Sequence, residues 1–252
     1  MAVEFFEKGE NRDRNLDVED DDNEDFLHFS HHHRLAAKNY RQEVKDDTIL
    51  TCQGCIQPIT QDFYSCSSKQ EEESCRHFYL HKICARLRRK LLLPLHQHEF
   101  TLLPRASSID GVFKCYMCGI FHHGFVYSCV QCALLAGENL CYIDLECSLY
   151  WETRDLKHES HSHRLLLDVE YDEHVCCKGC GSKLYLCFEF SCKRCNYHLC
   201  IACVRLPLTA RHRYDTHVLQ LTYAGNESKV GYYCEICEGT RDPENWFYYC
   251  RQ

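Results

Sequence analysis

Residues 161–203 read HSHRLLLDVEYDEHVCCKGCGSKLYLCFEFSCKRCNYHLCIAC, and this stretch decides the fold. It opens on a His-x-His pair and continues with three Cys-x-x-Cys pairs. Two ligands this close in sequence can bend around one ion in a single turn, and two such turns complete a closed tetrahedral zinc site. The four pairs therefore predict two zinc ions. Gly179 and Gly181 suit a cysteine turn, because its amides must aim at sulfur and its backbone often needs a positive φ.

The same order of ligand pairs recurs along the chain at intervals of about fifty residues, which indicates a tandem array. The repeats span residues 26–94, 95–157, 158–210 and 211–252, after an acidic segment, 1–25, that is typical of a disordered tail. Alternating patterns such as 125–128 and 165–169, with no long helical period, predict short antiparallel β-hairpins. The expected fold class is a set of small metal-stabilised modules with irregular loops and short helical turns.

The composition excludes several classes of protein. The 252 residues include 22 Cys and 17 His in clusters too short to build one large core. Chains this rich in cysteine are secreted disulfide scaffolds or intracellular metal binders, and the segment Met1–Lys8 lacks the pattern of a signal peptide. We therefore expect an intracellular protein, cytoplasmic or nuclear, with no transmembrane segment. The net charge of -8 disfavours nucleic acid as a partner.

Two repeats depart from the pattern. In the first, a polar insertion separates Cys66 from Cys75, although a longer loop adds little to the cost of closing on one ion. In the second, the closing His-x-x-Cys is missing before Cys147. The spacing favours Asp144 as the missing ligand, whereas the softness of the site favours Cys141, and zinc accepts both donor types.

The fourth repeat stops before its closing pair. It offers candidate ligands only at His212, His217, Cys234, Cys237 and Cys250. Neither of its sites can be completed with four ligands of its own, so the sequence predicts a truncated repeat. Residues 246–249, all aromatic, are then expected to be partly exposed.

The ordered set His-x-His-x-Leu, Cys-x-x-Cys-Gly, Tyr-Ser-Cys-x-x-Cys, Phe-x-Leu-His-x-x-Cys resembles the plant cysteine/histidine-rich family of divergent C-one domains, relatives of the diacylglycerol-binding zinc module. The resemblance covers residues 26–252 and implies tandem cross-braced zinc-binding domains with two zinc ions each. The first cysteine pair would share one ion with the closing pair, and the leading histidines would share the other with the second cysteine pair. Carried over by position, the zinc ligands are Cys52, Cys55, His81 and Cys84 with His31, His33, Cys66 and Cys75 in the first repeat; Cys115, Cys118, Asp144 and Cys147 with His96, His98, Cys129 and Cys132 in the second; and Cys177, Cys180, Cys200 and Cys203 with His161, His163, Cys192 and Cys195 in the third.

The expected function is a non-catalytic zinc-binding scaffold that binds a protein partner in signalling or stress response. Diacylglycerol is not the expected ligand, because the loop 119–124 does not resemble the apolar-rimmed groove of the parent module. Hydrolysis is disfavoured, because catalytic zinc keeps an open position. The alternative is a thiol–disulfide oxidoreductase acting as a protein-disulfide reductase, since Cys-x-x-Cys is also a redox motif, but no thioredoxin-like frame is visible.

Overall fold

The computed structural model describes residues 25–44, 48–68, 73–93, 96–136, 141–152, 155–170, 172–184, 187–212, 215–223 and 232–250. The predicted tail therefore lies outside the described residues, apart from Asp25. The chain divides into two compact units between Leu149 and Tyr150. One unit holds the first repeat and the second repeat up to Leu149, and the other holds the third and fourth repeats.

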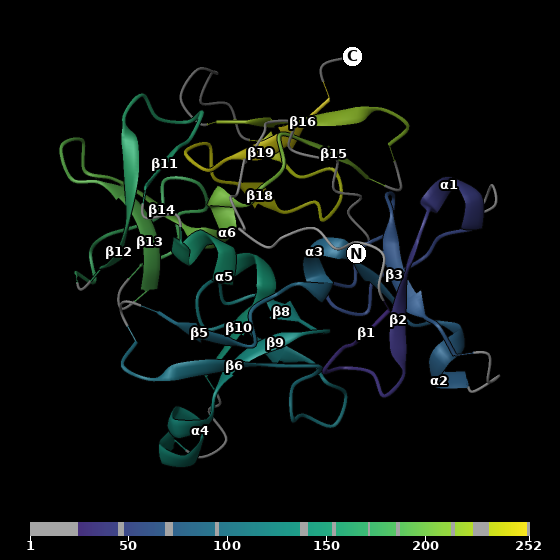
Figure 1. Ribbon diagram of the computed structural model, residues 1–252. Helices are drawn as coiled ribbons and strands as arrows, with labels where there is room; N and C mark the ends of the chain where they lie inside the picture. The colour runs from purple at the N-terminus through teal and green to yellow at the C-terminus, as the bar shows by residue number, and fades with distance from the viewer. Residues whose placement is uncertain are drawn as a thin grey trace. The chain divides into compact units, whose positions relative to one another are not determined.

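The first repeat forms a four-stranded antiparallel sheet in the order β1-β2-β3-β4. Figure 1 shows its strands in purple and blue. Strand β2 begins directly after His33, and β3 ends at Cys66. Their antiparallel pairing therefore brings ligand pairs that are distant in sequence to one edge of the sheet. The elements are β1 (Phe26–Leu27), β2 (Arg34–Lys38), α1 (Tyr40–Glu43), β3 (Phe63–Cys66), α2 (Glu73–Arg76), β4 (Tyr79–His81) and α3 (Lys82–Ala85).

The second repeat builds an equivalent sheet in the order β10-β9-β6-β5, with a small separate hairpin of β7 and β8. Its first strand, β5, lies within the sequence range expected for the first repeat, because it precedes the histidine pair. The elements are β5 (Lys90–Leu92), β6 (Glu99–Leu103), β7 (Phe113–Lys114), β8 (Phe121–His122), β9 (Val126–Cys129), α4 (Val130–Ala136), β10 (Cys141–Asp144) and α5 (Leu145–Glu152). Helices α4 and α5 exceed the single helical turn expected after a cysteine pair.

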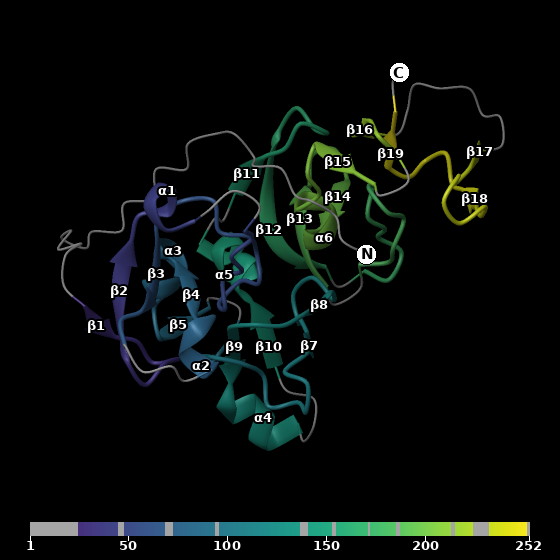
Figure 2. The ribbon, with the colours of Figure 1, turned by 90° about the vertical axis from the view of Figure 1, so that its right-hand side faces the viewer.

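The third repeat repeats the four-stranded order β11-β12-β13-β14, and the fourth repeat has a three-stranded sheet, β15-β16-β19, within the described residues. Figure 2 shows the small β17–β18 hairpin, in yellow, apart from that sheet. The third repeat comprises β11 (Asp155–Lys157), β12 (Arg164–Glu170), β13 (Cys187–Cys192), β14 (Tyr197–Cys200) and α6 (Ile201–Val204); the fourth comprises β15 (Thr209–Arg211), β16 (Val218–Thr222), β17 (Tyr232–Tyr233), β18 (Thr240–Arg241) and β19 (Phe247–Tyr249). Like β5, strands β11 and β15 begin within the range expected for the preceding repeat.

Each four-stranded sheet buries a row of apolar side chains across its last two strands. Tyr64, Tyr127 and Phe190 occupy the middle of the third strand, and each pairs with an aliphatic residue of the fourth strand. Alternation places these side chains on the same face of each sheet. Their aliphatic partners, all nearly inaccessible to solvent, are Leu80, Ile143 and Leu199. Each of these aromatic–aliphatic pairs forms part of the small core of its repeat.

The third repeat also buries a polar pair of side chains at positions where the second repeat has a valine and a tyrosine. Glu189 on β13 is fully buried, and its carboxylate lies 2.9 Å from Nδ1 of His198 on β14. Burial raises the pKa of Glu189, and the hydrogen bond with His198 opposes that rise. Register places Val126 and Tyr142 of the second repeat at these two positions. The same two positions of the ladder therefore hold a polar pair in the third repeat and a largely apolar pair in the second.

In both units an aromatic residue of the later repeat packs on the earlier repeat. The amide of Phe125 donates to the Gly54 carbonyl at 2.8 Å, and the Phe125 ring stacks on His28 at 5.8 Å. Trp246 makes the same two contacts with Gly179 and His158, at 2.8 and 5.5 Å. His158 therefore packs against the later repeat.

These contacts explain the glycine within two of the cysteine turns. A Cβ atom at Gly54 would lie 3.2 Å from the Phe125 ring, and one at Gly179 would lie 3.1 Å from the Trp246 ring. Gly179 thus provides space and does not adopt a positive φ, unlike Gly181, whose φ is +71°. The second and fourth repeats have Met117 and Ile236 at this position, so they do not leave the same space for an aromatic ring.

Candidate metal centres

The first Cys-x-x-Cys turn of each of the four repeats has the same backbone geometry. In each, the amide of the first cysteine donates to the carbonyl five residues later, and the amide four residues later donates back to the first cysteine's carbonyl. The residue at that fourth position has a positive φ, which folds the chain around the sulfur atoms. In the first to fourth repeats this residue is Ile56, Gly119, Gly181 and Glu238, respectively.

Two groups combine the first cysteine pair of a repeat with its closing pair, and we call such a group a cysteine site. They contain Cys52, Cys55, His81 and Cys84 in the first repeat and Cys177, Cys180, Cys200 and Cys203 in the third. Within each group the donor atoms all lie within 4.8 Å of one another. The Sγ atoms of Cys180 and Cys200 are 3.8 Å apart, which is too far for a disulfide bond.

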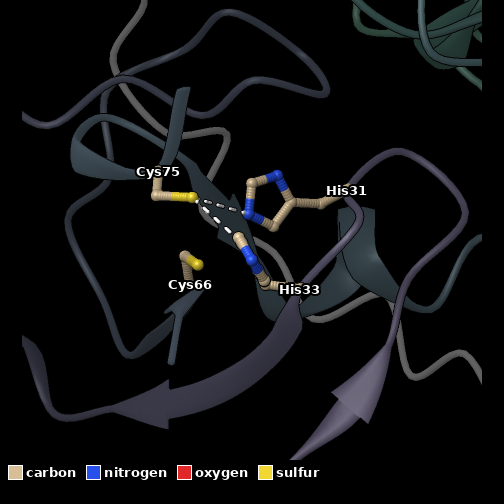
Figure 3. Close-up of side chains that lie close together, drawn as sticks. All are labelled: His31, His33, Cys66 and Cys75. Atoms are coloured by element: carbon tan, nitrogen blue, oxygen red, sulfur yellow. Dashed lines mark hydrogen bonds between the residues drawn. The ribbon is translucent and has the colours of Figure 1, made fainter. Parts of the chain in front are cut away.

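Three further groups combine the leading histidines with the second cysteine pair, and we call each a histidine site. Figure 3 shows the first, in which His31, His33, Cys66 and Cys75 converge although 42 residues separate His33 from Cys75. Nδ1 of His33 lies 3.1 Å from the Cys75 sulfur, and Nε2 of His31 lies 3.7 Å from it. The insertion before Cys75 thus leaves the group intact. The other two groups are His96, His98, Cys129 and Cys132, and His161, His163, Cys192 and Cys195.

The histidine sites share an orientation of their imidazole rings. The first histidine presents Nε2 and the second presents Nδ1, at 3.4 Å and 3.4 Å from the Cys132 sulfur in the second repeat. An aromatic ring fixes the first imidazole: Phe78 stacks on His31 at 4.2 Å, and Tyr197 stacks on His161 at 4.4 Å. These half-buried rings therefore support the histidine ligands.

The donor separations fit a tetrahedral metal ion. Zinc bonds of about 2.3 Å to sulfur and 2.0–2.1 Å to nitrogen place tetrahedral ligand atoms roughly 3.3–3.8 Å apart. Nε2 of His161 and Nδ1 of His163 are 3.4 Å apart, and that Nδ1 is 3.2 Å from the Cys195 sulfur. Backbone amides also donate to the sulfurs, as from Gly179 and Cys200 to Cys177 at 3.3 Å each. Such bonds stabilise thiolate charge.

In the second repeat, Asp144 lies at the position that His81 and Cys200 occupy in the two cysteine sites. Asp144 faces Val126 across the ladder, as His81 and Cys200 face their own third strands. Its amide donates to the Cys115 sulfur at 3.5 Å, as the amides of His81 and Cys200 donate to the first cysteine of their repeats. Asp144 therefore stands at the ligand position that spacing favoured.

Cys141, the other alternative, lies elsewhere. It pairs with Cys129 across β9 and β10, as Tyr197 pairs with Cys192, so it occupies the place of an aromatic support. Its side chain is buried, and burial raises the pKa of the thiol to about 12. The sequence could not separate the two alternatives without this register.

One donor near this site escaped the sequence analysis. His122, on β8, places Nε2 3.5 Å from Oδ2 of Asp144 and 3.7 Å from the Cys118 sulfur. It belongs to none of the ordered ligand pairs, so the repeat pattern gave no reason to select it. Comparison of the position seven residues after each first cysteine would have revealed a histidine where the first and third repeats have Ile59 and Leu184.

The fourth repeat contributes a cysteine turn and scattered histidines. Cys234 and Cys237 lie in the shared turn geometry, and the Cys234 amide bonds to the Gly239 carbonyl at 2.9 Å. Nδ1 of His217 is 3.1 Å from an Asp215 carboxylate oxygen. His212 precedes two undescribed residues, and Cys250 follows β19. As expected, Trp246 is partly exposed and Tyr249 is exposed.

Hydrogen bonds between neighbouring thiols of these sites shift their pKa values in opposite directions. Hydrogen bonds from Cys115 and Cys147 lower the pKa of Cys118 to about 4, while bonds to Cys115 and Cys118 raise the pKa of Cys147. In the first repeat, bonds to Cys52 and Cys55 raise the pKa of His81 to about 10. Neighbouring thiols cannot all ionise without a cation between them, so metal binding here must release protons.

No protein-family model, curated protein or solved structure matches the chain. Among the helices of the described residues, none is both long enough and apolar enough to span a membrane. The Cys and His clusters are compatible with metal binding, and their geometry carries the functional argument.

Proposed function

We propose that the chain is a zinc-binding scaffold of tandem cross-braced modules that binds a protein partner. The observation that carries the proposal is the interleaving of the ligand pairs: five groups of four donors each join pairs that alternate along the sequence. This is the arrangement that the resemblance to divergent C-one domains implies, so it also favours that family.

Zinc is the metal that these donors favour. Sets of four Cys and His ligands with tetrahedral spacing are typical of structural zinc sites, whereas Mg²⁺ and Ca²⁺ need oxygen donors. Structural zinc contributes on the order of 10 kcal/mol to folding, which suits repeats with small cores. Four protein ligands leave no open position for a substrate, which supports a scaffold without catalysis.

A protein partner is supported by exposed apolar side chains in the second repeat. Ile109, Val112 and Tyr116 are exposed, and so are Ile120 and Phe121 of the loop that was expected to lack an apolar rim. Apolar groups in water favour contact with another surface. We assign the scaffold to intracellular signalling or stress response, in the cytoplasm or the nucleus, on the basis of the resemblance alone.

The test is elemental analysis of protein purified without chelator, together with titration of reactive thiols. About six zinc ions per chain, two for each of the first three repeats, and few reactive thiols are expected. Little zinc with many reactive thiols would overturn the proposal and favour the protein-disulfide reductase. A matched sample dialysed against chelator should gain reactive thiols as it loses zinc.

A further inference from the structure

The residue seven positions after the first cysteine occupies the same place in the first three repeats. Its backbone pairs with that of the residue two positions before that cysteine. In the first and third repeats this residue is Ile59 or Leu184, each almost fully buried. In the second it is His122, whose side chain is partly exposed. The backbone pairings are Ile59 with Leu50 at 2.8 Å, Leu184 with Val175 at 3.0 Å, and His122 opposite Phe113 in the β7–β8 hairpin.

The histidine appears in the repeat whose closing ligand is hardest. The first and third cysteine sites end on His81 and Cys200, which give nitrogen and sulfur donors, whereas the second has Asp144. Three thiolates with one imidazole form a common structural zinc set, and a carboxylate is a harder donor. An imidazole beside Asp144 would supply the soft donor that this repeat lacks.

The distances place the imidazole where a ligand would lie. Oδ2 of Asp144, Nε2 of His122 and the Cys118 sulfur form a triangle with sides of 3.4, 3.5 and 3.7 Å. These lengths are those of tetrahedral edges around zinc. The other oxygen, Oδ1 of Asp144, accepts hydrogen bonds from the amides of Glu146 and Cys147 at 3.0 Å each, so this carboxylate also caps α5.

We propose that Nε2 of His122 is a ligand of the metal ion bound by Cys115, Cys118 and Cys147. This inference rests on the proposed zinc function and adds a ligand that lies outside the repeat pattern. Asp144 keeps its place as the cap of α5 and as an oxygen donor beside the ion. The β7–β8 hairpin then contributes a ligand to the site. The first and third repeats have their four donors without a ligand from this position.

The variant test compares two neighbouring histidines in the full-length chain. His122→Leu introduces the side chain found at Leu184, and His123→Leu is the matched control because His123 is exposed and outside the site. In competition with a zinc chelator, His122→Leu should release one zinc equivalent at least tenfold more readily, by the scale of ligand-shell losses, whereas His123→Leu should match the wild type. Adding Asp144→Cys to His122→Leu should restore tight binding, because it recreates four thiolates.

A direct readout covers the case in which a variant fails to fold. Wild-type protein with ¹⁵N-labelled histidine and ¹¹³Cd in place of zinc should show scalar coupling between the metal and Nε2 of His122. Loss of this coupling in His122→Leu assigns the signal. Full zinc content with unchanged chelator release in His122→Leu and no coupling at His122 would overturn this inference while leaving the scaffold proposal intact. A wild-type chain without zinc would instead defeat the scaffold proposal.

Discussion

The second repeat closes its cysteine site on Asp144 and buries Val126 beside Tyr142, whereas the third uses Cys200 and buries Glu189 beside His198. The strand order and the register of the two sheets are the same. Their backbones therefore tolerate different ligand chemistry and different core polarity at matched positions. The backbone hydrogen bonds and the turn geometry therefore define the repeat. Its ligands and its core pairs can change in type, provided that the paired side chains change together.

Metal removal tests what the two repeats have in common and should have the largest effect. If metal sites hold both ladders together, chelation should remove on the order of 10 kcal/mol per ion and unfold both repeats. Far-UV circular dichroism and amide dispersion should collapse together and return with zinc, but not with magnesium. A sheet signal that survives complete removal of metal would show that the cores suffice alone.

Exchange of the core pair tests the deepest difference between the repeats. Glu189→Ala removes the nearest carboxylate from buried His198, leaving that of Glu170 3.8 Å away, and should cost about 3–5 kcal/mol, whereas Val126→Ala should cost about 1–3 kcal/mol. The double variant Glu189→Val with His198→Tyr, which copies the second repeat, should recover most of the loss. Urea unfolding of zinc-saturated protein measures all three. A double variant as unstable as Glu189→Ala would mean that the two cores are not interchangeable.

Gly179 and Met117 occupy matched positions in their cysteine turns but should respond differently to alanine. At Gly179 a Cβ atom would lie 2.7 Å from the Cys203 sulfur, so Gly179→Ala should cost about 1–3 kcal/mol and displace Trp246. Met117→Ala removes buried atoms without touching Trp246. Tryptophan emission in a Trp151→Phe background should shift only for Gly179→Ala. Equal emission spectra for the two variants would contradict the conclusion that Gly179 leaves space for Trp246.

The smallest expected effects concern the turn residue that the two repeats share. Gly119 and Gly181 both have φ near +70°, so alanine at either should cost about 1 kcal/mol, with more at Gly181 because its Cβ would meet Asn245 at 2.9 Å. Glu238→Gly, at the same position of the fourth repeat, should instead stabilise by up to about 1 kcal/mol. Thermal unfolding provides the ranking, and a loss of stability in Glu238→Gly would argue against strain there.

The sequence carried the spacing of the ligands well, because each pair lies within one turn and the order repeats. The structure brings together five groups made of the residues that were placed together by position. Strand alternation likewise predicted short antiparallel sheets. The choice between Asp144 and Cys141 needed the register of β9 and β10, since both residues precede Cys147 at plausible spacing.

Other features depend on contacts between distant residues that no local pattern encodes. His122 reaches its site only through the β7–β8 hairpin, and Glu189 meets His198 across a strand pair. Gly179 reads as a turn residue in sequence, but the third dimension shows that it makes room for Trp246. The burial of polar Glu189 could not be read from an alternating strand, in which it resembles an exposed residue.

The contact between Gly54 and Phe125 has a consequence for the order in which the chain is made. Gly54 and Phe125 are separated by roughly seventy residues, as are Gly179 and Trp246. Synthesis proceeds from the amino terminus, so the earlier residue of each pair is made first. The Gly54 carbonyl therefore waits for its amide partner until the next repeat has left the ribosome. During translation the first repeat therefore emerges before its contact with Phe125 can form.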